Sequence, residues 1–251
     1  MTETRHICQR FTRLPGVELR STWQSRQAYK YHRHTRLSIG AITKGQTCCI
    51  CNGREYILNP GDIVIIPANA PHSCNPVDGQ PRSYHMLYIE TDLQPAQQMI
   101  RSVELFSCYQ QIVEQIQTTH ALLAIEKLLA LLPGKPAVPE TLRPSSQQLQ
   151  QALLESLQTP PSLETLARTF ALRKETLIRT FKQDTGMTPG SFLNMARVEY
   201  AKTRLLAGDN IADVSYQSGF ADQSRFHKTF VSYTSATPRQ YATGRSITDN
   251  N

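Results

Sequence analysis

The sequence has no long hydrophobic run and no apolar leader. Its longest leucine-rich stretch, 121–132, is interrupted by Glu126 and Lys127 and falls far short of the roughly 20 apolar residues that a bilayer crossing requires. The first residues, 1–13, mix Arg, Glu and His without an apolar centre, which is unlike a secretory signal. These absences predict a cytoplasmic protein that makes no membrane contact.

Strong compositional bias is also missing. Apolar residues make up 39% of the 251-residue chain and charged residues 19%, which excludes a disordered chain and a collagen-like fibre. A length of this size predicts one large or two modest domains. The net charge of +7 is shared between the two halves, so local charge placement has to identify a partner.

Zinc-type cysteine spacing is absent as well. Cys48, Cys49, Cys51 and Cys74 are four of the six cysteines, and their spacing matches no CxxC zinc pattern. A reducing compartment keeps such thiols unpaired. The first interpretation is small buried or half-buried side chains, and the alternative is a redox or soft-metal sensor.

Short apolar runs separated by turn signals fill the first hundred residues. Strands are predicted over 37–44, 46–51, 54–58, 63–66 and 84–89. Asn52-Gly53 is a strong hairpin signal, because both residues tolerate positive φ. Many short strands with regular turns predict an antiparallel β-barrel or jelly roll.

The apolar period changes to that of helices after residue 92. Between 112 and 132, Ile and Leu recur at helical spacing, which predicts amphipathic helices flanking the barrel. Four prolines then fall within 133–146, a composition typical of a linker. The predicted organisation is a β-rich domain over 1–132, a linker over 133–146 and an all-helical domain over 147–251.

The C-terminal half contains an internal repeat with a period of about 49 residues. The apolar and turn positions that repeat at an offset of 48 or 49 pair as follows: Leu163 with Ile211, Leu166 with Val214, Ala167 with Ser215, Leu177 with Phe226, Phe181 with Phe230, Thr188 with Thr237 and Pro189 with Pro238. Each copy predicts two helices joined by a turn, the helix-turn-helix layout. A continuous linker helix over 189–207, with Pro189 near its start and Gly208 past its end, is predicted to join the copies.

Polar donors mark the second helix of each copy. The first copy carries Arg173, Lys174, Arg179 and Lys182, and the second carries Gln223, Ser224, Arg225, His227 and Lys228 after Asp222, a predicted helix cap. Such side chains contact phosphates and base edges in a major groove. One charged helix face is usually only solvated, but two at repeated spacing favour DNA binding. A rigid linker helix would fix their separation for successive grooves about 34 Å apart.

Residues 147–241 resemble the DNA-binding domain of the AraC/XylS family of bacterial transcription regulators. The matching segments are LARTF (166–170), LIRTFKQDTGMTP (177–189), ARVEYAKTRLL (196–206), IADVSYQSGFADQSRFHKTF (211–230) and TPRQY (237–241). Ser215, Val231 and Ser235 stand where the family usually has alanine, lysine and glycine. The resemblance implies that the base-reading residues are Glu175, Ile178, Arg179, Gln223, Ser224, Arg225 and Lys228.

The N-terminal half resembles the cupin-like effector domain of many AraC-type regulators. His32-Arg33-His34 looks like the first cupin motif. The second motif is matched by Gly61, Pro67, His72 and Asn75, with Asn69 where a glycine is usual. The glutamate of metal-binding cupins is missing after His34, so the resemblance implies a metal-free pocket without a cofactor. The effector-binding candidates are His32, His34, Arg36, His72 and His85.

Together these features predict an α+β chain with a cupin-like antiparallel barrel and a C-terminal all-α domain of two helix-turn-helix units. The predicted function is a homodimeric transcription regulator, not an enzyme, that binds double-stranded DNA and responds to a small-molecule effector. The resemblance points to an activator with RNA polymerase as a further partner, although the residues themselves do not separate activation from repression.

Two other functions remain open from the sequence. Three imidazoles alone can bind zinc, iron or nickel, so the alternative is a cupin-type metal-dependent enzyme with a helical appendage. A constitutive regulator whose barrel only dimerises is a third hypothesis. The leucines at 112–132 fit packing on the barrel as well as packing on a second copy.

Overall fold

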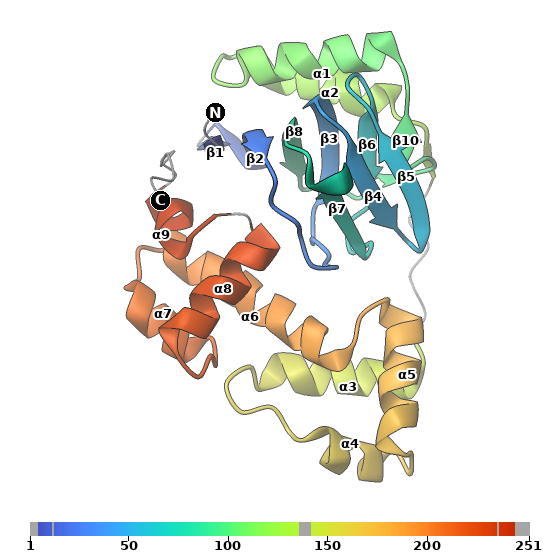
Figure 1. Cartoon of the computed structure of the whole chain (residues 1–251), viewed down its shortest axis with the longest axis vertical. Helices are drawn as coiled ribbons and strands as arrows, with labels where there is room; N and C mark the ends of the chain where they lie inside the picture. Colours follow the sequence, from blue (N-terminus) through green and yellow to red (C-terminus); the bar gives the residue numbers. More distant parts are fainter. Residues whose placement is uncertain (1–4, 12, 136–141, 235, 244–251) are drawn as a thin grey trace. The chain divides into compact units, whose positions relative to one another are not determined.

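The computed structural model describes residues 5–11, 13–135, 142–234 and 236–243. It shows a β-rich unit followed by a helical unit (Figure 1). The strands of the first unit are β1 (Arg5–Phe11), β2 (Leu14–Ser25), β3 (Leu37–Lys44), β4 (Thr47–Cys51), β5 (Arg54–Leu58), β6 (Ile63–Ile66), β7 (His72–Pro76), β8 (Arg82–Ile89), β9 (Gln94–Pro95), β10 (Met99–Ile100) and β11 (Gly134–Lys135). Its helices are the short 3-10 turn η1 (Val77–Gly79), α1 (Val103–Gln115) and α2 (Ala121–Leu131).

Two antiparallel sheets form the body of the β-rich unit. The larger has the strand order β1-β2-β8-β3-β6-β10, and the smaller has the order β5-β4-β7. The described strands of the two sheets do not close into one continuous ladder. The Asn52-Gly53 hairpin forms as predicted, with Cys51 opposite Arg54 and Asn52 at a φ of 49°. The antiparallel β fold with flanking helices is therefore confirmed.

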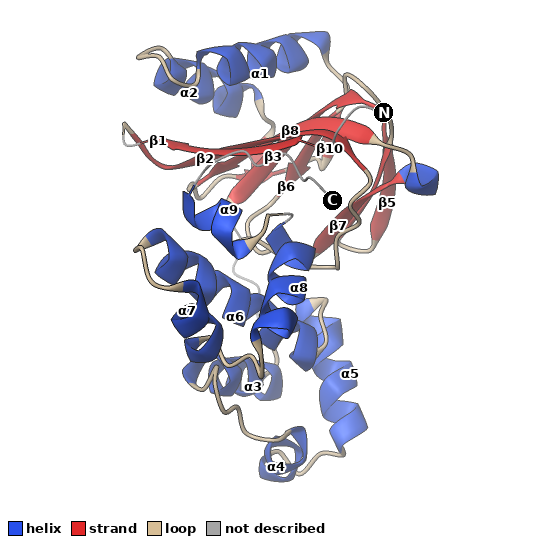
Figure 2. Cartoon of the chain, turned by 60° about the vertical axis from the view of Figure 1, so that its left-hand side comes forward, coloured by secondary structure: helices blue, strands red, loops and turns tan. Residues whose placement is uncertain are grey.

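Side chains alternate across the large sheet and bury both of its faces. On one face Leu19, Ile39 and Leu87 pack with α1 and α2, which lie over the sheet in Figure 2. On the other face Ile42 and Val64 pack with residues of the smaller sheet. Because both faces are covered, β3 is buried along most of its length, and its first six residues are apolar or small on both faces.

The leucine-rich segment near 112–132 packs mainly on its own sheet. Ile112, Ile125 and Leu128 belong to the core that α1 and α2 share with the large sheet. Leu122 and Leu123 point outward, with 53% and 68% of their surface exposed. Most of the predicted apolar stripe is therefore used within the unit, and only a small part of α2 remains apolar and exposed.

The helical unit contains α3 (Pro144–Glu155), α4 (Leu163–Thr169), α5 (Lys174–Thr185), α6 (Pro189–Leu206), α7 (Ile211–Gln217), α8 (Gln223–Thr234) and α9 (Pro238–Thr243). The predicted linker helix is α6, which begins at Pro189 after a Thr188 cap. It contributes Phe192, Val198 and Leu205 to the core of the unit. Figure 1 shows α6 running between the α4–α5 and α7–α8 pairs.

Two parts of the sequence predictions fall at the edges of what the structure describes. Of the predicted linker 133–146, residues 136–141 lie outside the described residues, whereas β11 and the first turn of α3 occupy its two ends. Ser235 also lies outside them. Among the described residues, no helix combines the length and apolar character that a bilayer crossing demands.

Candidate nucleic-acid interface and effector pocket

The two helix-turn-helix units correspond residue by residue at the offsets found in the sequence. In the first unit Leu172 N donates to Ala167 O over 2.9 Å, and in the second Phe220 N donates to Ser215 O over 3.4 Å. Both bonds close the turn before the second helix. The change of offset from 48 to 49 falls at Ala221, an extra residue in the second turn.

A pair of threonines ends the second helix of both units in the same way. Thr185 Oγ1 donates to Phe181 O over 2.7 Å, and its equivalent Thr234 donates to Phe230 O over 2.8 Å. Each hydroxyl also accepts from a backbone N–H two residues later, over 3.3 Å and 3.2 Å. Satisfying buried polar groups identically in both copies shows that the repeat is structural and not only a similarity of sequence.

The predicted DNA-reading side chains lie on the outer surface of α5 and α8. Exposed members are Arg173, Lys174, Glu175, Arg179 and Lys182 in the first unit and Gln223, Ser224, Arg225 and Lys228 in the second. Ile178 is half-buried. The apolar side of each helix is anchored by buried Leu177 and Phe181 or by buried Phe226 and Phe230, so the polar side necessarily faces outward.

Contacts with neighbouring residues determine which charges α5 and α8 expose. Lys174 forms an ion pair with Glu164 of α4, and the resulting hydrogen bond lowers the pKa of Glu164. In the second unit Asp222 Oδ1 accepts from Arg225 N over 2.7 Å, which confirms Asp222 as the helix cap. The carboxylate thereby binds the backbone at the start of α8 and not a reading side chain.

One exposed cation near α8, Arg239, adds to the predicted set. Arg239 at the start of α9 lines a surface hollow together with Gln223, Ser224, His227 and Lys228. His227 was predicted as a donor, but Arg239 was not, because the TPRQY motif alone does not show that α9 approaches α8. The hollow brings donors from both helices to one surface, as a phosphate backbone requires.

The linker helix α6 fixes the distance between the two helix-turn-helix units. Its 18 residues span about 27 Å at 1.5 Å per residue. Arg197 of α6 donates from Nε to Leu157 O over 2.8 Å, which ties the helix to the segment between α3 and α4. The separation of the units is therefore set by a packed helix and not by a flexible chain.

In the β-rich unit, a buried carboxylate gathers three arginines. Glu18 is 1% exposed and accepts from Arg10 over 2.9 Å, Arg20 over 2.5 Å and Arg36 over 3.3 Å. Arg20 and Arg36 also lie over the Tyr88 ring, at 4.7 and 5.8 Å from its centroid. Three cations around one carboxylate leave a local excess of positive charge, which suits an anionic ligand.

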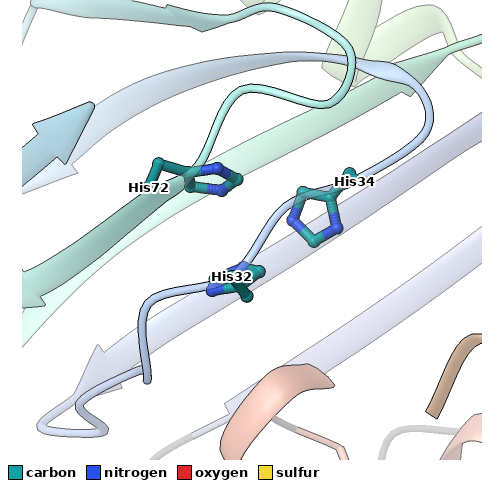
Figure 3. Close-up of side chains that lie close together, drawn as sticks. All are labelled: His32, His34 and His72. Carbon is teal, nitrogen blue, oxygen red and sulfur yellow. The ribbon is translucent and has the colours of Figure 1, made fainter. Parts of the chain in front are cut away.

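Two of the predicted effector-binding histidines lie together in the β-rich unit. The His34 and His72 ring centroids are 5.0 Å apart (Figure 3), and His34 makes an edge contact with Tyr88 at 5.1 Å. Arg36 lies over the same Tyr88 ring, so three of the five candidates lie near one another. The segment that carries His32 groups with the helical unit instead.

His85 lies apart from the other candidates. It pairs with Ser21 across β2 and β8, and its Nδ1 lies 2.7 Å from Ser21 Oγ. Strand alternation places it on the face of Leu87, opposite the face of Tyr88. Burial lowers the pKa of His85, which favours the neutral form of this side chain.

The cysteines agree with the first interpretation of small buried or half-buried side chains. All six are free thiols. Cys49 and Cys74 face one another across β4 and β7 with their sulfur atoms 2.8 Å apart. The hydrogen bond with Cys74 and burial raise the pKa of Cys49, and burial raises the pKa of Cys51 to about 12. High thiol pKa values disfavour a reactive thiolate at neutral pH.

Comparisons with known proteins match both units. Residues 14–158 match the family model described as an AraC-like ligand binding domain, and residues 166–244 match a helix-turn-helix domain. The chain is 27% identical over 227 residues to the uncharacterized HTH-type transcriptional regulator YbfI of Bacillus subtilis, covering 79% of this chain and 81% of that protein. It is 25% identical to the HTH-type transcriptional activator RhaS of Enterobacter sp., covering 87% and 89%.

Solved structures support the same fold. A single-residue variant of apo ToxT from Vibrio cholerae strain SCE256 has a TM-score of 0.56 at 15% identity, with 91% of this chain and 97% of that chain covered. A fatty-acid-bound ToxT from the same strain has a TM-score of 0.52 at 14% identity, with 95% and 94% covered. Since the ligand-binding model alone matches more than half of the chain and the helix-turn-helix model matches most of the rest, the protein belongs to the AraC family of transcriptional regulators.

Proposed function

We propose that the protein controls transcription by placing α5 and α8 in successive major grooves of one promoter site. The observation that carries this proposal is the repeat of exposed donors on two helices that a packed α6 holds apart. Arg179 and Arg225 are its main base-reading cations, since guanidinium groups bind guanine edges in a bidentate manner. Lys182, Lys228 and Arg239 supply phosphate contacts.

The β-rich unit senses a small anionic molecule at His34, His72 and Arg36. The excess of arginines around Glu18 and the ring contacts to Tyr88 support this choice. His85 is left out because it lies on the other face of the sheet. The solved relative ToxT binds an unsaturated fatty acid, which has the same anionic character.

The regulatory complex follows from these two activities. We infer a cytoplasmic homodimer that binds rather than transforms its ligand and that contacts RNA polymerase when it activates transcription. Exposed Leu122 and Leu123 on α2 supply the apolar surface for the second copy. The effector then acts by binding one arrangement of the two units better than another.

Salt-dependent DNA binding tests the proposal. Fragments recovered by genome-wide mapping of bound DNA should bind with an affinity that falls steeply with salt. Arg179→Ala and Arg225→Ala should each cost about 1–3 kcal/mol of binding and relax preference at one base pair. Lys127→Ala removes an equal charge from exposed α2 and should leave binding unchanged. Unaltered affinity in both arginine variants would show that the reading faces are assigned wrongly.

A further inference from the structure

The smaller sheet of the β-rich unit carries two cysteines side by side. Cys49 of β4 lies opposite Cys74 of β7 in the antiparallel register. Residues directly opposite one another in such a pair have Cα atoms about 4.5 or 5.5 Å apart, depending on the hydrogen-bonding pattern. Both separations fall within the range of about 4.4–6.8 Å that a disulfide bridges. The register alone therefore places the two thiols where they can bond without backbone movement.

The two side chains already point toward one another. Their Sγ atoms lie 2.8 Å apart, so an approach of about 0.8 Å reaches the length of a disulfide bond. Cys49 packs in the core between the two sheets, and half-buried Cys74 packs against the same core. Cys51, two residues along β4, lies opposite His72 instead and is only a diagonal neighbour of Cys74. Cys49 is therefore the partner that Cys74 meets first.

A buried arginine holds the two strands in position at this pair. Arg82 is 1% exposed. It donates from Nη1 to Thr47 Oγ1 of β4 over 3.0 Å and from Nη2 to Cys74 O of β7 over 2.7 Å. Hydrogen bonds from a charged donor are stronger than those between neutral groups. The guanidinium group thus spans β4 and β7 and keeps the two thiols opposite one another before any bond forms.

The strand that carries Cys74 lies at the edge of its sheet. The smaller sheet has the order β5-β4-β7, so among the described strands β7 pairs with β4 alone. Elements held by few contacts open locally more readily than those in the middle of a core. A covalent bond from β7 to β4 would restrict this opening and stiffen one wall of the core between the sheets.

Burial separates the roles of the two sulfur atoms. Cys74 is half-buried, whereas Cys49 has no exposed surface, so a small oxidant reaches Cys74 first. The hydrogen bond with Cys74 and burial raise the pKa of Cys49. Cys49 therefore stays a protonated thiol until Cys74 has reacted.

We propose that Cys49 and Cys74 form a peroxide-sensitive thiol–disulfide site that ties β7 to β4 when it is oxidised. The Cys74 thiolate attacks one oxygen of hydrogen peroxide, which breaks the O–O bond, releases hydroxide and leaves a sulfenic acid. The Cys49 sulfur then attacks Cys74 Sγ, the S–O bond breaks, and the hydroxide leaves with the Cys49 proton as water. The first hydroxide takes up the proton that Cys74 had lost. The net change is two thiols oxidised to a disulfide and the peroxide reduced to water, and it requires neither DNA nor the effector.

Counting thiols after oxidation tests the site. The full chain has six cysteines, and hydrogen peroxide should remove two titratable thiols that dithiothreitol then restores. Digestion with trypsin followed by mass spectrometry should find the peptides 45–54 and 55–82 joined within one chain. Amide hydrogen exchange in β7 should slow and the thermal midpoint should rise, because the crosslink restrains both the strand and the unfolded chain.

Single substitutions identify the two sulfur atoms. Cys49→Ala should abolish the loss of two thiols and leave a sulfenic acid at Cys74 that dimedone traps. Cys74→Ala, at the half-buried position, should abolish the disulfide as well, and it carries the test if Cys49→Ala does not fold. Cys48→Ala and Cys51→Ala are matched controls on the same strand, and both should still lose two thiols.

Several results would each overturn the inference. The parent could keep all its thiols at peroxide concentrations that leave the fold intact, or the loss of two thiols could persist in Cys74→Ala. A bond between two chains, or one that Cys48→Ala or Cys51→Ala removes, would show that Cys49 and Cys74 are not the reacting pair. Unchanged hydrogen exchange in β7 of the oxidised chain would show that the bond does not restrain this strand.

Discussion

The two helix-turn-helix units share their internal hydrogen bonds but differ in their turns, helix starts and surface charges. Thr185 and Thr234 make the same bonds at the end of the second helix, and Thr188 and Thr237 both accept from the N–H three residues later. These bonds satisfy backbone groups at the helix ends that have no partner within the helix. What the two copies share is therefore dictated by folding, and what they do not share is available for recognition.

The turns show the first difference. Ala171 occupies the positive-φ position of the first turn at 51°, and Gly219 occupies the equivalent position at 78°. A Cβ on Gly219 would lie 2.5 Å from Leu157 O and 2.7 Å from Gln158 Cα. The second turn packs against another backbone segment that leaves no room for a side chain, whereas the first turn accommodates a methyl group.

The starts and the surfaces of the helices in the two units show the second difference. Arg173 caps α5 without a side-chain hydrogen bond, but Asp222 caps α8 with one. Glu164 pairs with Lys174 in the first unit, and the matching position in the second is Ala212. Arg239 in the second unit occupies the position that corresponds to Gly190 in the first. The second unit thus gains cap stability and cationic surface, while the first uses a cation to neutralise its own carboxylate.

The largest expected effect concerns the turns. Gly219→Ala should lower the free energy of unfolding by about 2–4 kcal/mol, because it adds both positive-φ strain and a clash with backbone atoms. The matched change Ala171→Gly should stay within about 1 kcal/mol of the parent. Chemical denaturation followed by circular dichroism measures both. Equal effects in the two turns would mean that Gly219 does not approach Leu157 as closely as described.

The helix caps give an intermediate effect. Asp222→Ala removes the side-chain bond to Arg225 N and should cost about 0.5–2 kcal/mol of stability. Arg173→Ser supplies the missing cap in the first unit, so stability should rise while DNA affinity falls with the lost cation. Denaturation and DNA titration on the same samples separate the two quantities. A stability loss in Arg173→Ser would contradict the account of that helix start.

Local sequence signals located most of the secondary structure correctly. The hairpin at Asn52-Gly53, the strands 37–44, 54–58 and 63–66, and the helix opened by Pro189 all appear at or near their predicted bounds. Each depends on neighbours in sequence: a turn dipeptide, a short apolar run or a proline with fixed φ. The repeat was equally visible, because buried positions such as Phe181 and Phe230 must be apolar in both copies.

Features that depend on tertiary contacts were not predictable in this way. β2 was not predicted, because Glu18 and Arg20 break its apolar pattern; only the fold shows that they neutralise one another in the sheet. His85 was grouped with the other histidines, although strand alternation turns it to the opposite face. Arg239 was overlooked because only the packing of α9 brings it to the surface of α8.

The smallest expected effect tests the charge difference between the units. Glu164→Gln frees Lys174 for a phosphate, so DNA affinity should rise slightly and the slope of log affinity against log salt should steepen by up to about 0.9. Ala212→Glu places the matching carboxylate in the second unit and should lower affinity. The double variant Glu164→Gln/Lys174→Gln should show no steeper slope than the parent. If the double variant also showed a steeper salt dependence than the parent, the cation released by Glu164→Gln would not be Lys174. The charge difference between the two helix-turn-helix units would then not come from the Glu164–Lys174 ion pair.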